Sequence, residues 1–319
     1  MSRFLVIGIV VAACLVLLVP LAGSQYLTTH VTRILVYAIF AVSLDLLVGF
    51  CGLVSLGHAA FFGIAAYATA LLADKVGVTN VLISLPFSIL CATGTALVIG
   101  LLTLRTAGIY FIMATLALAE MLYFLVHDND FFGGSDGILV LSRFYLGSTS
   151  IDVSDPVIRY CVVVTVTVAV LVGLAFLVRS PFGRTLQGIK SNERRMRALG
   201  YNIARYKLAC FVIGGALAGL AGHLYLLLTS LADPSILDWI HSAQVLMMVI
   251  LGGLGTLVGP MVGAFVFVEL IDQMSVLTEH WKLAVGIVVV VATLFGRGGI
   301  AGVAGRTRAW GVGAKRPIT

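Results

Sequence analysis

The sequence predicts an all-α protein, a polytopic bundle of membrane helices with about eight to ten transmembrane segments. Of its 319 residues, 60% are hydrophobic and only 11% are charged, and the mean hydropathy is +1.10. Soluble domains usually carry about 25% charged residues, so this composition excludes an ordinary soluble protein. The apolar residues form continuous runs, whereas a membrane β-barrel would show short alternating strands.

Ten apolar runs follow one another along a single predicted transmembrane domain, residues 1–319. A full-length run crosses a hydrocarbon core about 30 Å thick as a helix, but runs 59–73 and 242–251 are too short to cross unaided. Run 4–21 has the features of either a retained first helix or a cleavable signal peptide, and its length favours the retained helix. The other runs are 31–49, 81–104, 107–126, 157–178, 208–228, 261–277 and 283–295.

Positive charge collects in two places, which sets the predicted orientation. Segment 179–207 carries eight Lys or Arg and one acid, Glu193, and the tail 297–319 is also basic. Basic loops beside spans stay in the cytoplasm, near anionic lipid. Loop 127–156 carries five Asp and is expected on the outer side, as is 231–241. Ten segments with both termini in the cytoplasm satisfy these charge biases. The positive charge of the chain is expected to face the lipid bilayer, and no nucleic-acid partner is expected.

Two Gly-rich breaks interrupt the runs, at residues 49–58 and 252–260. Both contain Gly-Leu-x-[Ser/Thr]-Leu, which suggests an internal repeat. Irregular backbone at membrane depth is tolerated where protein or a water-filled cavity covers it, and transporters place binding or gating there. The other interpretation is a tight turn whose glycines only allow close helix packing. The candidate pathway or gating residues in and near the breaks are Asp45, Gly52, Ser55, His58, Glu120, Gly252, Gly253 and Gly255.

A buried charge in a helix centre costs about 2.5–3.5 kcal/mol, so such residues usually face a cavity or a partner. Asp45 and Glu120 are therefore expected to face a polar interior, and the alternative is a hydrogen-bonded carboxyl that joins helices. His223 and Glu269 lie nearer span ends, where a side chain is able to reach the interface, so for these two the interpretation of a hydrogen-bonded group that joins helices is favoured. His58 has the alternative of bonding a nearby backbone carbonyl.

The basic segment 179–207 is expected to contain two short helices. Pro181 starts one that runs to about Lys190, Ser191 or Asn192 caps a second, and Gly200 ends it. Ile189, Met196 and Leu199 would give it a small apolar surface. The segment is thus either a lipid-facing loop or a cytoplasmic helix that docks on another protein.

The sequence contains no phosphate-binding GxxxxGK[ST] and no HExxH motif. The five cysteines also lack metal-ligand spacing. Neither an enzyme nor a cofactor or metal site is expected, so any ATPase activity that drives transport must come from another chain.

Residues 48–63, VGFCGLVSLGHAAFFG, resemble the signature of the branched-chain amino acid ABC transporter permeases, LivM-like subunit. Four further stretches match in order: 108–117, 133–137, 183–200 and 249–263. The resemblance covers about residues 44–267. The sequence departs from the family pattern at Ala65 and Glu120, which leaves the substrate open.

The resemblance implies one of two unlike permease subunits of an ATP-driven importer in the bacterial inner membrane. A LivH-like second permease, two cytoplasmic ABC ATPases and a periplasmic substrate-binding protein would complete it. Branched-chain amino acids are the implied substrate. Urea or a short amide is an alternative substrate, and an ion-coupled secondary transporter is an alternative class.

The resemblance also assigns two sets of residues. The outer-loop motif comprises Gly133, Gly134, Asp136 and Gly137. The coupling segment that would meet the ATPase comprises Gly183, Arg184, Ile189, Asn192, Glu193, Met196, Leu199 and Gly200.

Overall fold

A computed structural model describes residues 24–147, 152–295 and 299. The predicted run 4–21 lies outside the described residues, as does the tail 297–319 apart from residue 299. Within the described part, six helices are long and apolar enough to cross a membrane, and two apolar helices are shorter. The predicted fold class, a polytopic helical membrane bundle, is confirmed.

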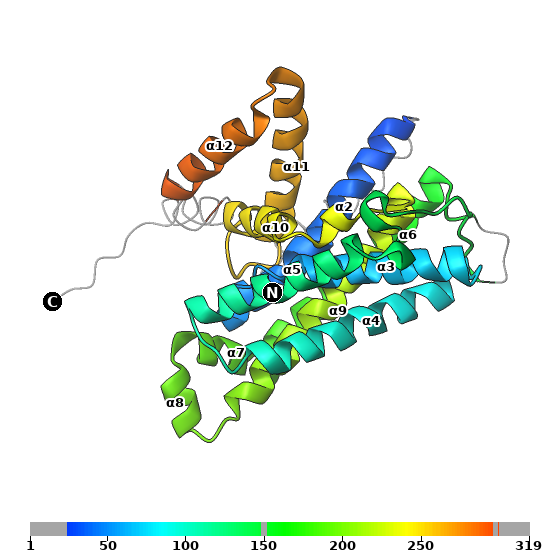
Figure 1. Ribbon diagram of the computed structural model, residues 1–319. Helices are drawn as coiled ribbons and strands as arrows, with labels where there is room; N and C mark the ends of the chain where they lie inside the picture. The colour runs from blue at the N-terminus through cyan, green and yellow to red at the C-terminus, as the bar shows by residue number, and fades with distance from the viewer. Residues whose placement is uncertain (1–23, 148–151, 296–298, 300–319) are drawn as a thin grey trace.

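The described chain is helical apart from one small sheet (Figure 1). Its helices are α2 (Gln25–Asp45), α3 (His58–Lys75), α4 (Val81–Thr103), α5 (Ile109–His127), α6 (Pro156–Arg179), α7 (Pro181–Ser191), α8 (Glu193–Ala198), α9 (Ile203–Thr229), α10 (Trp239–Gly252), α11 (Gly259–Leu277) and α12 (Trp281–Phe295). A π-helical turn, η2 (Leu46–Cys51), continues α2. Three short 3-10 turns are η3 (Asp130–Phe132), η4 (Gly134–Asp136) and η5 (Pro234–Leu237).

Local sequence explains where several long helices begin. Ser24, Asn80 and Asp155 are the N-caps of α2, α4 and α6, and each side chain accepts a hydrogen bond from a backbone N–H of the first turn. Pro156 follows Asp155 at the first helical position, where its missing N–H costs nothing.

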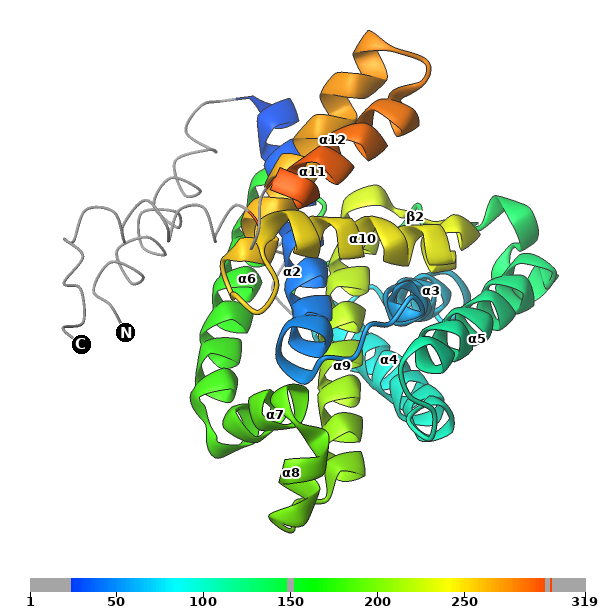
Figure 2. The ribbon, with the colours of Figure 1, turned by 90° about the vertical axis from the view of Figure 1, so that its left-hand side faces the viewer.

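Helix α2 forms the centre of the bundle. In its apolar stretch 94% of the residues are buried, against 22–28% for α4, α5, α6 and α11. Figure 2 shows α2 between α6, α9 and α10, with α7 and α8 together at one end. The outer helices instead expose large apolar side chains such as Leu90 and Met121, as lipid-facing helices do. Helix α2 is therefore in contact with most of the bundle interior.

The single sheet joins two loops that are far apart in sequence. Strand β1 (Ile138–Leu139) pairs antiparallel with β2 (Leu231–Ala232). Loops 128–155 and 230–238 therefore lie on the same side of the bundle, as their shared acidic character predicts. Within the first loop, hydrogen bonds from Ser154 lower the pKa of Asp152, which keeps this carboxyl charged.

Candidate functional site

The two Gly-rich breaks meet at Asp45. This residue is the last of α2 before the π-helical turn, and its side chain is buried. Its Oδ1 atom accepts a hydrogen bond of 2.8 Å from the backbone N–H of Gly255, in the second break. A Cβ atom on Gly49, one turn later, would lie 2.5 Å from the Gly255 nitrogen and closer still to Asp45 Oδ1. Only glycine at position 49 allows the two breaks to approach this closely.

The π-helical turn is where α2 stops. The backbone N–H groups of Gly52 and Leu53 both donate to the Leu47 carbonyl, and Gly52 adopts a left-handed conformation, φ +79°. This arrangement ends a helix and leaves carbonyls of the last turn without partners in their own helix. The Gly49 carbonyl finds its partner elsewhere: the Nζ atom of Lys190 donates to it at 2.5 Å.

Helix α7 packs on the same π-helical turn. Leu186 is fully buried and belongs to an apolar cluster with Phe50 and Cys51 of the turn. The basic segment therefore touches the first break through Leu186 and Lys190. The first break in turn touches the second through Asp45 and Gly49.

The two helices predicted in the basic segment are confirmed. Asn192 is the N-cap of α8, with its side-chain oxygen 3.0 Å from the Arg195 nitrogen, and Ser180 caps α7. Gly200 follows α8 with φ +87°, and nothing lies near the position of its Cβ. Gly183 is buried against the Val178 carbonyl at the end of α6.

Of the three residues predicted to form a small apolar surface on this segment, Ile189 is buried. Leu186 and Ile189 are three residues apart, so they share a face of α7, and that face is turned to the bundle. Met196 covers Gly188, while Leu199 is 66% exposed.

Polar side chains give α8 a fixed position and a basic surface. Glu193 accepts a hydrogen bond of 2.7 Å from Lys207 of α9, and Arg197 lies 3.4 Å from its other oxygen. Its carboxylate thereby joins α8 to α9. The remaining arginines of α8 and Arg184 of α7 are exposed. This segment therefore presents several exposed cations together with the exposed Leu199.

His58 and Ser55 hold the first break in shape. His58 is fully buried, with its Nε2 atom 2.8 Å from the hydroxyl of Ser43, and its ring stacks on Phe40. Its partner is thus a side chain, whereas the alternative interpretation named a backbone carbonyl. Ser55 accepts a hydrogen bond from the Gly57 nitrogen at 3.3 Å.

Helix α3 starts at this break without a capping side chain of its own. Ser242 of α10 supplies one, since its hydroxyl accepts from the Ala59 nitrogen at 2.8 Å. The sequence analysis missed Ser242, because its role depends on a contact between positions 183 residues apart.

Glu120 lies apart from Asp45. It is half-buried, and its Oε1 atom accepts from the backbone N–H of Trp239 at 3.3 Å, at the first residue of α10. A carboxylate is favourable at a helix N-terminus. The second break begins at the C-terminal end of α10. Because α10 is about 20 Å long, Glu120 at its N-terminal end is far from this break. Glu120 therefore has the joining role that was its alternative interpretation.

The second break also has strained backbone that only glycine accommodates readily. Gly253 and Gly255 have φ values of +115° and +74°. Gly252, the last residue of α10, packs directly against the backbone of Gly259 and Pro260. The glycines of the second break thus allow the close packing that leads α10 into α11, and a role of this break in binding or gating stays a prediction.

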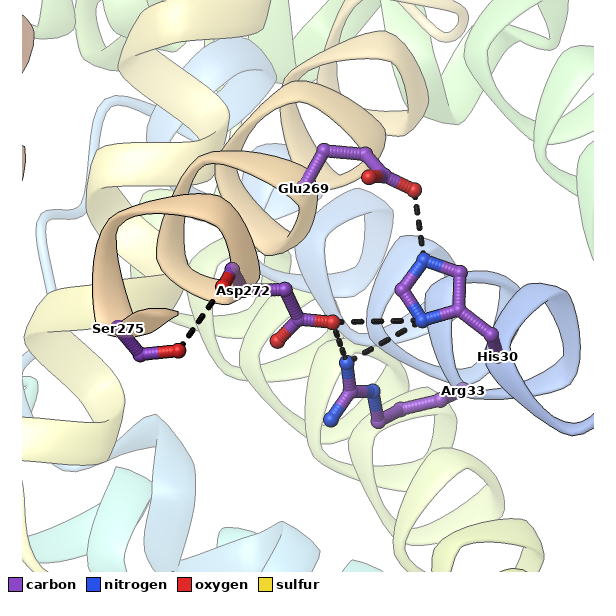
Figure 3. A network of polar contacts seen from close by, with 5 residues as sticks. All are labelled: His30, Arg33, Glu269, Asp272 and Ser275. Atoms are coloured by element: carbon purple, nitrogen blue, oxygen red, sulfur yellow. Dashed lines mark hydrogen bonds and ion pairs between the residues drawn. The ribbon is translucent and has the colours of Figure 1, made fainter. Parts of the chain in front are cut away.

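A second polar cluster joins α2 to α11 (Figure 3). His30 Nε2 lies 2.6 Å from Glu269, His30 Nδ1 lies 3.3 Å from Asp272, and the Arg33 guanidinium pairs with Asp272. Sequence analysis noted Glu269 near a span end and missed the others. The matched spacing, three residues apart on each helix, is the signal that could have found them.

His223 agrees with the interpretation of a polar side chain that joins helices. It is fully buried, and its Nδ1 atom lies 2.9 Å from the Thr69 hydroxyl of α3. A polar residue near the end of an apolar run can thus be covered by a neighbouring helix.

The outer-loop motif forms a tight, irregular turn. Gly133, Gly134 and Gly137 all have positive φ, and Gly137 packs against the Ala232 carbonyl of β2. Asp136 is exposed, 3.2 Å from the Ser135 hydroxyl. The glycines shape this loop, and Asp136 is free to face solvent.

Comparison with known proteins agrees with this architecture. The family model described as "Branched-chain amino acid transport system / permease component" matches residues 26–294. The chain is 29% identical over 291 residues to the high-affinity branched-chain amino acid transport system permease protein LivM of Escherichia coli K12, covering 84% of this chain and 68% of LivM.

Sugar permeases are also similar, over shorter lengths. The xylose transport system permease protein XylH of Escherichia coli K12 is 30% identical over 44% of this chain and 35% of its own. The ribose import permease protein RbsC of Bacillus subtilis is 28% identical over 42% and 44%. No solved structure matches. Since the family model spans nearly all described helices, the chain belongs to the branched-chain amino acid transport permease family, multi-pass membrane components of importers whose ATPase activity lies in separate subunits.

Proposed function

We propose that this chain is a membrane permease subunit of an ATP-driven importer that moves branched-chain amino acids into the cell. The α7–α8 segment is the observation that carries the proposal. It is basic and exposed on one side, and on the other it packs on the π-helical turn of the central helix. A segment of this kind can pass the movement of a soluble partner to the interior of the bundle.

In this proposal α7 and α8 lie in the cytoplasm and both termini face the same side, in the bacterial inner membrane. Two ABC ATPases bind the permease pair, and this chain presents α8 with Leu199 at its end. A LivH-like permease is the second subunit. A periplasmic binding protein delivers the substrate to the outer face, where the turn 133–137 and β1 lie.

The choice of amino acid over sugar rests on the extent of similarity. The LivM alignment covers 84% of this chain, whereas the xylose and ribose permeases align over 44% and 42%. Import of a pentose is therefore the second candidate, and it takes the place of urea or amides because these relatives favour it. The distinguishing measurement is the affinity of the cognate binding protein for leucine and for ribose.

The docking role of α8 is tested with Leu199→Asp. Leu199 is 66% exposed, so the bundle should fold normally, while a charge in a desolvated contact should reduce recovery of the ATPase with the tagged permease roughly tenfold or more. Leu141→Asp is the matched control, since Leu141 is 87% exposed beyond β1. Equal ATPase recovery with both variants would contradict docking through α8. Leucine uptake by the isolated chain, driven by an ion gradient, would instead favour a secondary transporter.

A further inference from the structure

We propose that the π-helical turn Leu46–Cys51 transmits movement of α7 to both Gly-rich breaks, with Lys190 as the positioning residue that attaches α7 to it. This inference rests on the proposed function, in which a partner bound to α7–α8 moves it. It adds a defined route from that segment into the bundle.

The first step of the route is the attachment of α7 to α2. Lys190 is an exposed residue, yet its ammonium reaches the carbonyl of buried Gly49. The last carbonyls of a helix carry partial negative charge and lack partners within it. Lys190 also stands in the last turn of α7, so its charge lies between the C-terminal ends of two helices. Buried Leu186 adds an apolar contact to the same turn.

The second step leads from this turn to the other break. Asp45 and Gly49 are four residues apart, at one end of the same helical stretch, and each touches a different partner. Gly49 bonds Lys190, and Asp45 bonds the Gly255 nitrogen at 2.8 Å. Because Gly49 has no side chain, the backbones of the two breaks are in direct contact. A shift of the Gly49 carbonyl must therefore shift Gly255.

Two features suit this turn to rearrangement. A π-helical turn has irregular hydrogen bonding and is common at functional sites. In addition, the Oδ2 atom of Asp45 is buried without a hydrogen-bond partner among the described residues. A buried, unpaired carboxylate oxygen is costly, so it favours movement to a second arrangement in which it is paired.

The test uses the complete transporter, with its ATPases and binding protein, in which the chain carries Leu254→Cys as a probe. Leu254 belongs to the second break and is 47% exposed. Cys14, the half-buried Cys91 and the exposed Cys161 are replaced by Ala, so that the other native thiols, Cys51 and Cys210, are buried. The labelling rate of the probe is measured with and without a non-hydrolysable ATP analogue. The analogue should change this rate at least about fivefold.

Three variants then decide the role of Lys190. Lys190→Met keeps an apolar stem without the charge and should reduce the nucleotide effect to less than about twofold, while ATPase binding and ATP hydrolysis persist. Lys190→Arg keeps the cation and should retain the effect. Lys282→Met, the same substitution at the exposed start of α12, is the control and should also retain it.

Each other outcome overturns the inference in a distinguishable way. A full nucleotide effect in Lys190→Met shows that movement reaches the break by another route, and the proposed function stands. Loss of ATPase binding in Lys190→Met assigns this residue to docking. If the parent chain binds no ATPase, the proposed function itself fails and the inference fails with it.

Discussion

Asp45 and Glu120 are both acidic residues within apolar runs, but the folded chain places them in different surroundings. Asp45 joins the two breaks, whereas Glu120 binds the start of α10 and is exposed in part. Each carboxylate accepts a backbone N–H from a distant segment, so each joins two parts of the bundle that are far apart in sequence. What separates them is the segment that supplies the N–H. Asp45 accepts from Gly255 inside the second break, whereas Glu120 accepts from Trp239 at the start of α10.

Gly49 is the residue at which substitution should be most informative. In Gly49→Ala the new methyl group would overlap Asp45 Oδ1 and the Gly255 nitrogen, so the breaks must separate. We expect a loss of about 1–3 kcal/mol of stability. The apparent midpoint of thermal unfolding in detergent should fall by roughly 3–10 °C.

Gly94→Ala is the matched control for this substitution. Gly94 lies inside α4, and nothing stands within 4 Å of its Cβ position. Since alanine favours a helix interior by up to about 1 kcal/mol, its midpoint should stay or rise. A Gly49→Ala midpoint equal to that of Gly94→Ala would show that the breaks are not packed as described.

At the scale of elements, α3 depends on another helix for its first turn, and α10 is bound to α5 at its first residue. Ser242 of α10 accepts from the first turn of α3, and Glu120 of α5 accepts from the first residue of α10. Helix starts buried in a bundle need such partners, because water is absent. The elements α5, α10 and α3 are therefore linked in series by polar contacts.

Ser242→Ala tests this linkage. It removes the acceptor of the Ala59 N–H and should cost about 1 kcal/mol, which corresponds to roughly 2–4 °C in the unfolding midpoint. Ser88→Ala serves as the comparison: that hydroxyl is buried but donates only to the Leu85 carbonyl of its own helix. Its midpoint should change by less than about 1 °C. Equal effects of the two substitutions would argue against a cap donated by α10.

At the scale of the whole molecule, the structure places the basic and acidic parts of the chain at different ends of the spans. Strands β1 and β2 join the two acidic loops, while α7 and α8 follow the opposite end of α6. This separation agrees with the charge bias of the loops. Which end faces the cytoplasm is part of the proposed function.

Thiol labelling in intact cells tests the orientation. Arg195→Cys, exposed on α8, should react with a membrane-impermeant reagent only after the cells are opened. Leu141→Cys, exposed beyond β1, should react from outside. The labelled fraction of each variant is compared before and after lysis, in a chain with Cys161 replaced by Ala. The reverse pattern would place α8 outside and would contradict an ATPase partner in the cytoplasm.

Patterns local in sequence anticipated much of this structure. The helix limits around Pro181, Asn192 and Gly200 followed from capping and turn chemistry, which depend on a few adjacent residues. The inward face of Ile189 did not follow, because it depends on how α7 packs on the rest of the bundle. The cluster of His30, Arg33, Glu269 and Asp272 was missed for a related reason: its members are neighbours only after α11 packs on α2.

The fold class, most of the helices, the basic segment and the family could be predicted without a structure, because composition, run length and motif order are properties of consecutive residues. The contacts of Asp45 with Gly255 and of Lys190 with Gly49 span 210 and 141 positions, and they exist only once the helices have packed. The physical reason is that helix packing brings such residues together through shape and buried hydrogen bonds, and spacing along the chain does not encode which distant backbone group a buried polar atom will reach.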